Sequence, residues 1–251
     1  MPIRGLHDDH VPQEIDADTG LPIGPRLANP NHAKRPERIA LEGRYCRLEP
    51  VDPARHREQL YAASTPPDAA RRFRYLYDTV PQSLADIDAW IARAAASDDP
   101  LVYAVIDRRS GRVEGRQSLM RITPEHQSLE IGNIYWGPAI ARTPVATEAN
   151  YLFAAYAFDT LGYRRYEWKC DALNAPSRRA AERFGFTYEG HFRRANINKG
   201  RSRDTTWFAM IDAEWPALKA AYQRWLDPAN FDARGQQRLR LGELTAQALR
   251  R

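Results

Sequence analysis

The sequence is poor in the residues that build a covalent or metal-stabilised scaffold. Its 251 residues include two cysteines, Cys46 and Cys170, which lie far apart and in no CxxC spacing. We therefore expect neither a disulfide framework nor a thiolate metal site, and we interpret both as buried small apolar residues. The His7-Asp8-Asp9-His10 cluster has metal-capable side chains but no further ligands nearby in the sequence, so no metal site is predicted.

Long apolar runs are also absent. No stretch reaches the roughly 18 apolar residues of a membrane span, and the first ten residues carry acids where a signal peptide has its apolar segment. A cytoplasmic protein is therefore expected. The formal net charge of +5 favours anionic ligands. Because the basic residues form no array interleaved with aromatic ones, nucleic acid is not favoured as a partner.

Proline content and apolar periodicity divide the chain into three parts. Residues 1–40 hold six prolines and no sustained periodicity, which predicts an extended arm. Residues 41–226 are predicted to form one α/β domain, and residues 227–251 a polar, arginine-bearing tail with some helical tendency. Alternating or apolar runs predict strands over 39–48, 101–107, 113–122, 128–136, 165–171, 186–193 and 203–211. Helical spacing and capping residues predict helices over 53–63, 83–96, 145–161, 174–184 and 213–226.

The segment 130–186 carries the strongest chemical signal. A turn that opens a helix directly after a strand directs backbone N–H groups outward at the positive end of the helix dipole. Here the strand ends near Trp136, a turn with two prolines follows, and the helix begins at Val145. This arrangement predicts an anion site, for which phosphate groups are natural ligands.

The order of short motifs in this segment resembles that of the GNAT acetyltransferases. The resemblance rests on Glu130-Ile131-Gly132, Ala146-Thr147-Glu148-Ala149, Asn174-Ala175-Pro176-Ser177, Gly185-Phe186, Glu189-Gly190, and Asp204, Trp207, Glu214 and Trp215 near the end. It covers roughly residues 41–216. Within the superfamily, the sequence most resembles the branch that includes the ribosomal-protein N-terminal (serine/alanine) acetyltransferases.

The resemblance implies both a fold and an activity. The fold would be the α/β GNAT fold: a mixed, mostly antiparallel sheet flanked by helices, with two parallel strands that splay apart at the cofactor site. The activity would be N-acetyl transfer from acetyl-CoA to a primary amine, by direct attack in a ternary complex. No metal would be required.

The resemblance also implies roles for particular residues. The backbone of three strand residues would pair with the pantetheine arm: Ile134, Tyr135 and Trp136. Five residues would contact the pyrophosphate: Arg142, Thr143, Val145, Ala146 and Thr147. Asn174 would hydrogen-bond the arm, Ser177 would protonate the departing thiolate, and Glu130 would act as general base for the amine. Each of these last three also has a structural explanation, since Asn174 and Ser177 suit a helix start and Glu130 suits an exposed strand face.

The phosphate loop departs from the family pattern at two positions. Ala141 stands where the family has glutamine or arginine, with Arg142 shifted by one. Pro144 occupies a position where the phosphate loop of the family has glycine, and proline has no N–H to donate. This difference motivates an alternative function, a non-catalytic GNAT-like module that binds acyl-CoA or regulates another protein.

The acceptor and the assembly stay open at this point. The acceptor could be a protein N-terminus, a small amine such as an aminoglycoside or polyamine, or an aminoacyl-nucleotide; a homodimer is one option for the assembly. Between His191 and Arg203 there are five basic residues and no acid: Arg193, Arg194, Lys199, Arg201 and Arg203. They indicate either a solvated hairpin or an electrostatic collar for an acidic substrate or the 3′-phosphate of the cofactor.

Overall fold

The structure is a computed structural model that describes residues 11–30 and 33–249. The cluster from His7 to His10 lies outside the described residues. The chain divides into two compact units, Met1–His32 and Ala33–Arg251. In the first unit, β1 (Glu14–Ile15) and β2 (Pro22–Ile23) pair antiparallel, and the Asp16 carboxylate accepts hydrogen bonds from two backbone N–H groups in the turn between them.

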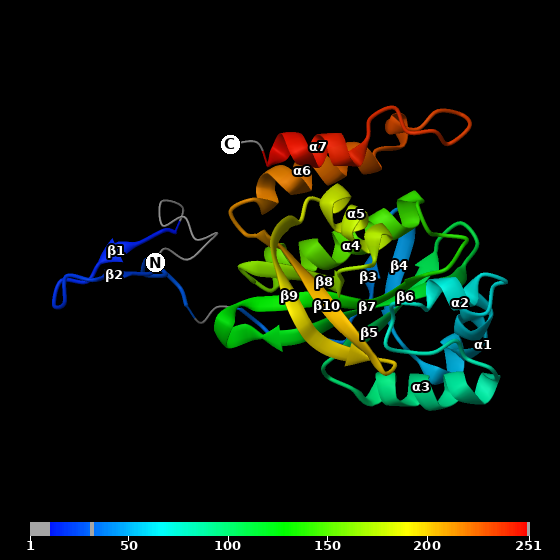
Figure 1. The fold of residues 1–251 in the computed structure, drawn as a ribbon. Coiled ribbons are helices and arrows are strands. Elements are labelled where there is room, and N and C mark those ends of the chain that lie inside the picture. Colours follow the sequence, from blue (N-terminus) through cyan, green and yellow to red (C-terminus); the bar gives the residue numbers. More distant parts are fainter. Residues whose placement is uncertain (1–10, 31–32, 250–251) are drawn as a thin grey trace. The chain divides into compact units, whose positions relative to one another are not determined.

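The second unit is built on an eight-stranded sheet with the order β3-β4-β5-β6-β7-β8-β10-β9 (Figure 1). The strands are β3 (Leu41–Glu42), β4 (Cys46–Pro50), β5 (Leu101–Asp107), β6 (Arg112–Thr123), β7 (Ser128–Trp136), β8 (Arg165–Asp171), β9 (Thr187–Asn198) and β10 (Arg201–Ile211). Every neighbouring pair is antiparallel except β7 and β8, which are parallel. The predicted mixed, mostly antiparallel α/β fold is therefore confirmed.

Helices cover both faces of the sheet. The helices of the second unit are α1 (Pro53–Ser64), α2 (Ala69–Arg72), α3 (Leu84–Ala96), α4 (Pro144–Ala155), α5 (Ala175–Phe184), α6 (Trp215–Leu226) and α7 (Leu241–Ala248). Along β5, Tyr103 packs in the main core with Phe153 of α4, whereas Ala104 packs in a second core with α1 and α3. Because successive strand residues point to opposite faces, β5 is buried on both sides.

The helix starts follow the signals in the sequence. At α3, Ser83 accepts from the N–H of Asp86 while Asp86 accepts from the N–H of Ser83, which forms a complete capping box. The side chain of Asn174 caps α5, and Gly185 ends it at a positive φ of 89°. These local signals explain why both helices lie where the sequence predicts them.

Two predicted elements differ from the structure. The single strand expected over 39–48 is divided into β3 and β4 by a turn, because the N–H groups of Arg44, Tyr45 and Cys46 turn toward the Glu148 carboxylate of α4. The helix expected over 145–161 is divided into two parts. The α-helix α4 ends at Ala155, and a short π-helix follows over Tyr156–Thr160.

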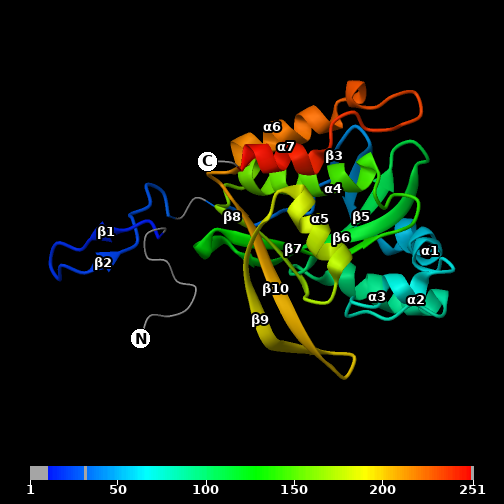
Figure 2. The same cartoon turned by 45° about the horizontal axis from the view of Figure 1, so that its top comes forward.

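Residues 227–249 extend the folded domain. A short turn of helix, Pro228–Asn230, is followed by α7, which packs on α6 and α5 (Figure 2). Leu241 and Leu244 of α7 are buried in the main core. Their spacing of three residues places both on one helix face, which allows a largely polar segment to bury one side. None of the described helices is long and apolar enough to cross a membrane.

A bulge in β7 separates this strand from β8. The two strands pair only from Ser128 with Arg165 to Ile131 with Trp168. Beyond this point the β6–β7 register shifts, and Asn133 has a left-handed backbone with φ 51°. A bulge of this kind adds an unpaired residue and bends the strand. The last five residues of β7 thus have an edge without a strand partner on the β8 side.

Candidate active site

A pocket with a volume of about 1030 Å³ opens where β7 and β8 separate. The ends of these two strands and the first turns of α4 and α5 contribute to its lining. Further lining residues come from β10, from Tyr75-Leu76-Tyr77 between α2 and α3, and from residues 235–237 of the C-terminal segment.

Nine of the residues predicted for the site line this pocket, and two do not. The lining includes Glu130, Ile134, Tyr135, Trp136, Arg142, Ala146, Thr147, Asn174 and Ser177. Val145 packs its side chain in the core, so only its backbone can contribute. The N–H and the hydroxyl of Thr143 both donate to the carbonyl oxygen of Ile140, at 3.1 and 2.7 Å, so neither is free for a ligand.

The start of α4 leaves two N–H groups for an anion. The N–H of Thr147 donates to the Thr143 carbonyl, which occupies it. Val145 and Ala146 lie in the first helical turn, where N–H groups have no acceptor within the helix. The exposed Arg142 precedes them at a positive φ of 66°. The amides available to a phosphate are thus fewer than the sequence resemblance implied.

Arg183 adds a cation at this helix start. It belongs to the last turn of α5, and its guanidinium donates to the hydroxyl of Thr147 at 3.2 Å. The same guanidinium lies over the rings of Phe184 and Trp225. Among residues 33–249 no carboxylate pairs with it. Sequence reasoning missed Arg183, because a basic residue in the last turn of a helix is common and no motif marks it.

The side chains of β7 hold the strand in place and leave its edge open. The Tyr135 hydroxyl donates to the carbonyl of Ala63 at 2.6 Å. The Trp136 indole N–H donates to Gln117, and its ring packs against Trp168 and Phe184. These side-chain contacts fix β7 to the rest of the protein and do not use its backbone. They are therefore compatible with the predicted role, in which the backbone of these residues pairs with an extended ligand.

Asn174 and Ser177 lie together at the start of α5. The Asn174 side-chain oxygen accepts from the Ser177 N–H at 3.2 Å, so the capping explanation for Asn174 holds. The Ser177 hydroxyl oxygen accepts from the indole N–H of Trp168 at 3.0 Å. This contact orients the oxygen, and the hydroxyl also lies within hydrogen-bonding reach of the Cys170 sulfur, to which it can donate its hydrogen when the pocket holds no other acceptor.

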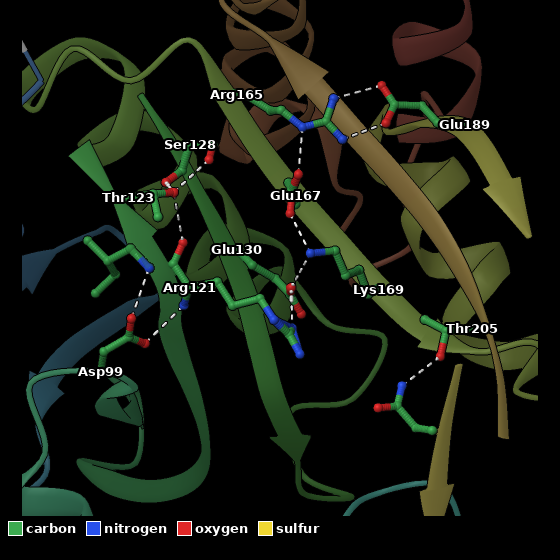
Figure 3. A network of polar contacts seen from close by, with 12 residues as sticks. Asp99, Arg121, Thr123, Ser128, Glu130, Arg165, Glu167, Lys169, Glu189 and Thr205 are labelled. Atoms are coloured by element: carbon green, nitrogen blue, oxygen red, sulfur yellow. Dashed lines mark hydrogen bonds and ion pairs between the residues drawn. The ribbon is translucent and has the colours of Figure 1, made fainter. Parts of the chain in front are cut away.

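Glu130 is buried, not exposed, and belongs to a chain of charges (Figure 3). Its Oε2 atom is 3.0 Å from the Lys169 ammonium and 2.8 Å from the Arg121 guanidinium. Lys169 also pairs with Glu167, and Arg165 links Glu167 to Glu189. Burial raises the pKa of Glu130, and the charges of Lys169 and Arg121 oppose this rise.

Gly132 provides space beside this carboxylate. A Cβ atom at this position would lie 2.2 Å from the Met120 sulfur and 3.4 Å from Oε1 of Glu130. Both Met120 and Glu130 line the pocket. Any larger residue at 132 would therefore displace side chains at the point where the carboxylate reaches the pocket.

Comparison with known proteins agrees with this geometry. A family model described as an acetyltransferase (GNAT) domain matches residues 46–187. A GCN5-related N-acetyltransferase from Brucella melitensis is 55% identical, with a TM-score of 0.86, and the match covers 88% of this chain and 100% of that one. A candidate GNAT acetyltransferase from Chromobacterium violaceum is 36% identical, with a TM-score of 0.73, covering 78% and 98%.

Solved structures with lower sequence identity to this chain support the fold and nothing further. A candidate ribosomal-protein-serine acetyltransferase from Vibrio cholerae is 18% identical, with a TM-score of 0.59, and the match covers 69% of this chain and 97% of that one. No curated protein matches the sequence. The family model spans more than half of the chain, and the Brucella and Chromobacterium proteins match most of it. The chain therefore belongs to the GNAT acetyltransferases, and it is an acetyl-CoA-dependent acyltransferase.

Proposed function

We propose that this enzyme transfers the acetyl group of acetyl-CoA to a primary amine, by direct attack within a ternary complex. The observation that carries the proposal is the gap between β7 and β8, whose lining includes the start of α4 and a buried carboxylate, Glu130. The pyrophosphate would bind the N–H groups of Val145 and Ala146 together with Arg142 and Arg183.

The pantetheine arm would then lie along the open edge of β7. An extended ligand can pair with unpaired strand amides as an added strand does. The backbone of Ile134, Tyr135 and Trp136 supplies this edge. One N–H near Ile134 or Tyr135 would face the thioester oxygen and stabilise the negative charge that develops on it.

The chemical step needs one proton acceptor and one donor. The amine nitrogen attacks the thioester carbon, and Glu130 takes its proton directly or through water. The carbon–sulfur bond breaks, and the Ser177 hydroxyl protonates the thiolate. Asn174, besides capping α5, is within the pocket lining and would hydrogen-bond the arm. Among the described residues no group of three His, Cys, Asp or Glu side chains could hold a metal, and the proposed step needs none.

Arg183 offsets the departure at Pro144 that motivated the non-catalytic alternative. The alternative arose because Pro144 removes one N–H from the phosphate loop. A guanidinium at the same helix start offers several donors and a full charge in place of one amide. The motif resemblance and the fold shared with the Vibrio cholerae protein support a protein N-terminus as one acceptor class. The cytoplasmic location and a homodimer stay predictions.

Replacing Ser177 with alanine is expected to lower kcat about tenfold while the affinity for acetyl-CoA stays within a factor of a few. The effect is moderate because a thiol of pKa about 8.5 is a good leaving group that needs little protonation. Calorimetric titration with acetyl-CoA, followed by steady-state CoA release with a seryl peptide and a polyamine, measures both quantities. The exposed Ser202 provides the control, Ser202→Ala. Absence of acetyl-CoA binding by the folded wild type would refute the proposed function.

Replacing Lys169 with methionine is expected to move the acid limb of the kcat/KM profile to higher pH by about one unit. Burial already raises the pKa of Glu130, and loss of the Lys169 charge removes one of the two cations that oppose the rise. The base would then be deprotonated only at higher pH. The same peptide amine is used for both enzymes, so its own titration cancels in the comparison. Lys219→Met, which removes a partly exposed ion pair with Asp159, is the control, and an unshifted limb argues against Glu130 as base.

A further inference from the structure

Arg203 of β10 is a buried cation that has no acidic partner within residues 11–30 and 33–249. Only 8% of the residue is exposed. Its Nε atom is fully buried and has no hydrogen-bond acceptor, and its guanidinium carbon lies 4.7 Å from the centre of the Tyr77 ring. Both residues line the pocket. Because an unpaired charge is costly to bury, such a group is a sign of a ligand that completes it.

Nearby acids are engaged elsewhere. Asp78 pairs with Arg116, and Asp204 accepts from the N–H of Arg194 and contacts His191. Asp171, which lies opposite Thr205 across the β8–β10 pair, accepts from the N–H of Leu173. Among the described residues no carboxylate therefore neutralises Arg203.

The position of Arg203 connects it to the reacting centre. Successive residues of a strand point to opposite faces, so Arg203, Thr205 and Trp207 share one face of β10, and all three line the pocket. At the other end of this row, Lys169 lies 3.7 Å from the centre of the Trp207 ring and pairs with Glu130. The pocket floor thus runs from the proposed general base to the unpaired guanidinium.

The part of the pocket lining beside Arg203 is built from other segments than the start of α4. The tip of the β9–β10 hairpin is joined to the segment after α2, since Lys199 donates to the Phe73 carbonyl and Asn198 to the Leu76 carbonyl. The start of α4, by contrast, contacts Arg183 and its aromatic neighbours. Arg203 is therefore placed to meet the acceptor and not the pyrophosphate.

We propose that Arg203 binds an anionic group of the acceptor, a carboxylate or a phosphate, so that the substrate is an amine that carries negative charge. This inference rests on the proposed function and names the substrate class for it. Of the basic residues in the hairpin, only Arg203 lines the pocket; Arg193, Arg194 and Arg201 are exposed. A planar guanidinium suits both anions because its parallel N–H groups match two oxygens at once. The anion takes no covalent part in the transfer.

The test uses primary alkylamines of graded length that end in a carboxylate, a phosphate or a neutral carboxamide. CoA release gives kcat/KM, and calorimetry on the acetyl-CoA-saturated enzyme gives the affinity for each amine. At the best length, the anionic amine is expected to exceed its carboxamide at least tenfold in both readouts. The preference between carboxylate and phosphate identifies the anion.

Variants separate this inference from the proposed function. Arg203→Ala should abolish the preference for the anionic amine, Arg203→Lys should retain part of it, and the matched control Arg201→Ala should retain all of it, with acetyl-CoA affinity unchanged throughout. Three outcomes would overturn the inference. The wild type could show equal kcat/KM for anionic and neutral amines, Arg203→Ala could keep the preference, or Arg203→Ala could lose affinity for acetyl-CoA. If no amine is acetylated, the proposed function fails, and the binding preference still decides the role of Arg203.

Discussion

Replacing Arg183 with alanine is expected to weaken acetyl-CoA binding by about 10- to 100-fold. Hydrogen bonds to charged groups contribute about 1.5–3 kcal/mol, which corresponds to that range. The guanidinium is held at the start of α4 by Thr147 and by the rings of Phe184 and Trp225, so it is ordered before the cofactor binds. A preordered donor loses little conformational entropy on binding. The effect should be large because Pro144 leaves this helix start with one N–H fewer.

Calorimetric titration with acetyl-CoA measures the change. Arg178→Ala removes an exposed arginine from the same helix, α5, and should leave the affinity unchanged. Arg183→Lys should lie between the wild type and the alanine variant, since lysine keeps the charge but not the planar fork. The weakening should also diminish with added salt. Equal affinities in Arg183→Ala and Arg178→Ala would place the pyrophosphate elsewhere.

Replacing Glu148 with glutamine is expected to lower the free energy of unfolding by about 3 kcal/mol. Its carboxylate is buried and accepts three backbone N–H groups, from Arg44 at 2.8 Å, Tyr45 at 2.6 Å and Cys46 at 2.7 Å. A glutamine amide has one oxygen acceptor and an NH₂ group that would face an N–H donor. The turn between β3 and β4 would then contain at least one buried N–H without an acceptor.

Urea unfolding followed by circular dichroism measures this loss as a lower midpoint at an unchanged slope. Glu182→Gln removes one charge from an exposed position on α5 and should change stability by no more than about 0.5 kcal/mol. A midpoint for Glu148→Gln equal to that of Glu182→Gln would show that the three contacts contribute nothing. The same residue belongs to the motif that signalled the family, yet its contacts are those of a structural anchor.

The site could be predicted from the sequence only where its signal was local. Asn174 was recognised at a helix start, and it caps α5 because an amide oxygen three residues before a free N–H can reach it in any helix. Arg183 acts across space, 36 residues from the hydroxyl it contacts. Nothing near Arg183 in the sequence distinguishes it from the exposed Arg178 and Arg179 on the same helix.

The C-terminal end of the folded domain also depends on contacts between segments that are distant in the sequence. Leu241 and Leu244 look like two apolar residues in a polar tail when read alone. They become core residues because α6 and the end of α5 offer an apolar surface to pack against. Burial depends on a partner surface, and the sequence of a segment does not contain its partner.

The sequence by itself determined the strands 101–107, 128–136 and 165–171, the capped helices α3 and α5, and the family, because alternation, capping and motif order are properties of neighbouring residues. Only the tertiary structure decided that β7 bends away from β8 at Asn133, and that Glu130 is buried between Lys169 and Arg121. It also decided that Arg203 lines the pocket without an acid from the described part of the chain. These features depend on which strands become neighbours. Desolvation and charge pairing arise between groups far apart in the chain, so they exist only once the sheet has formed.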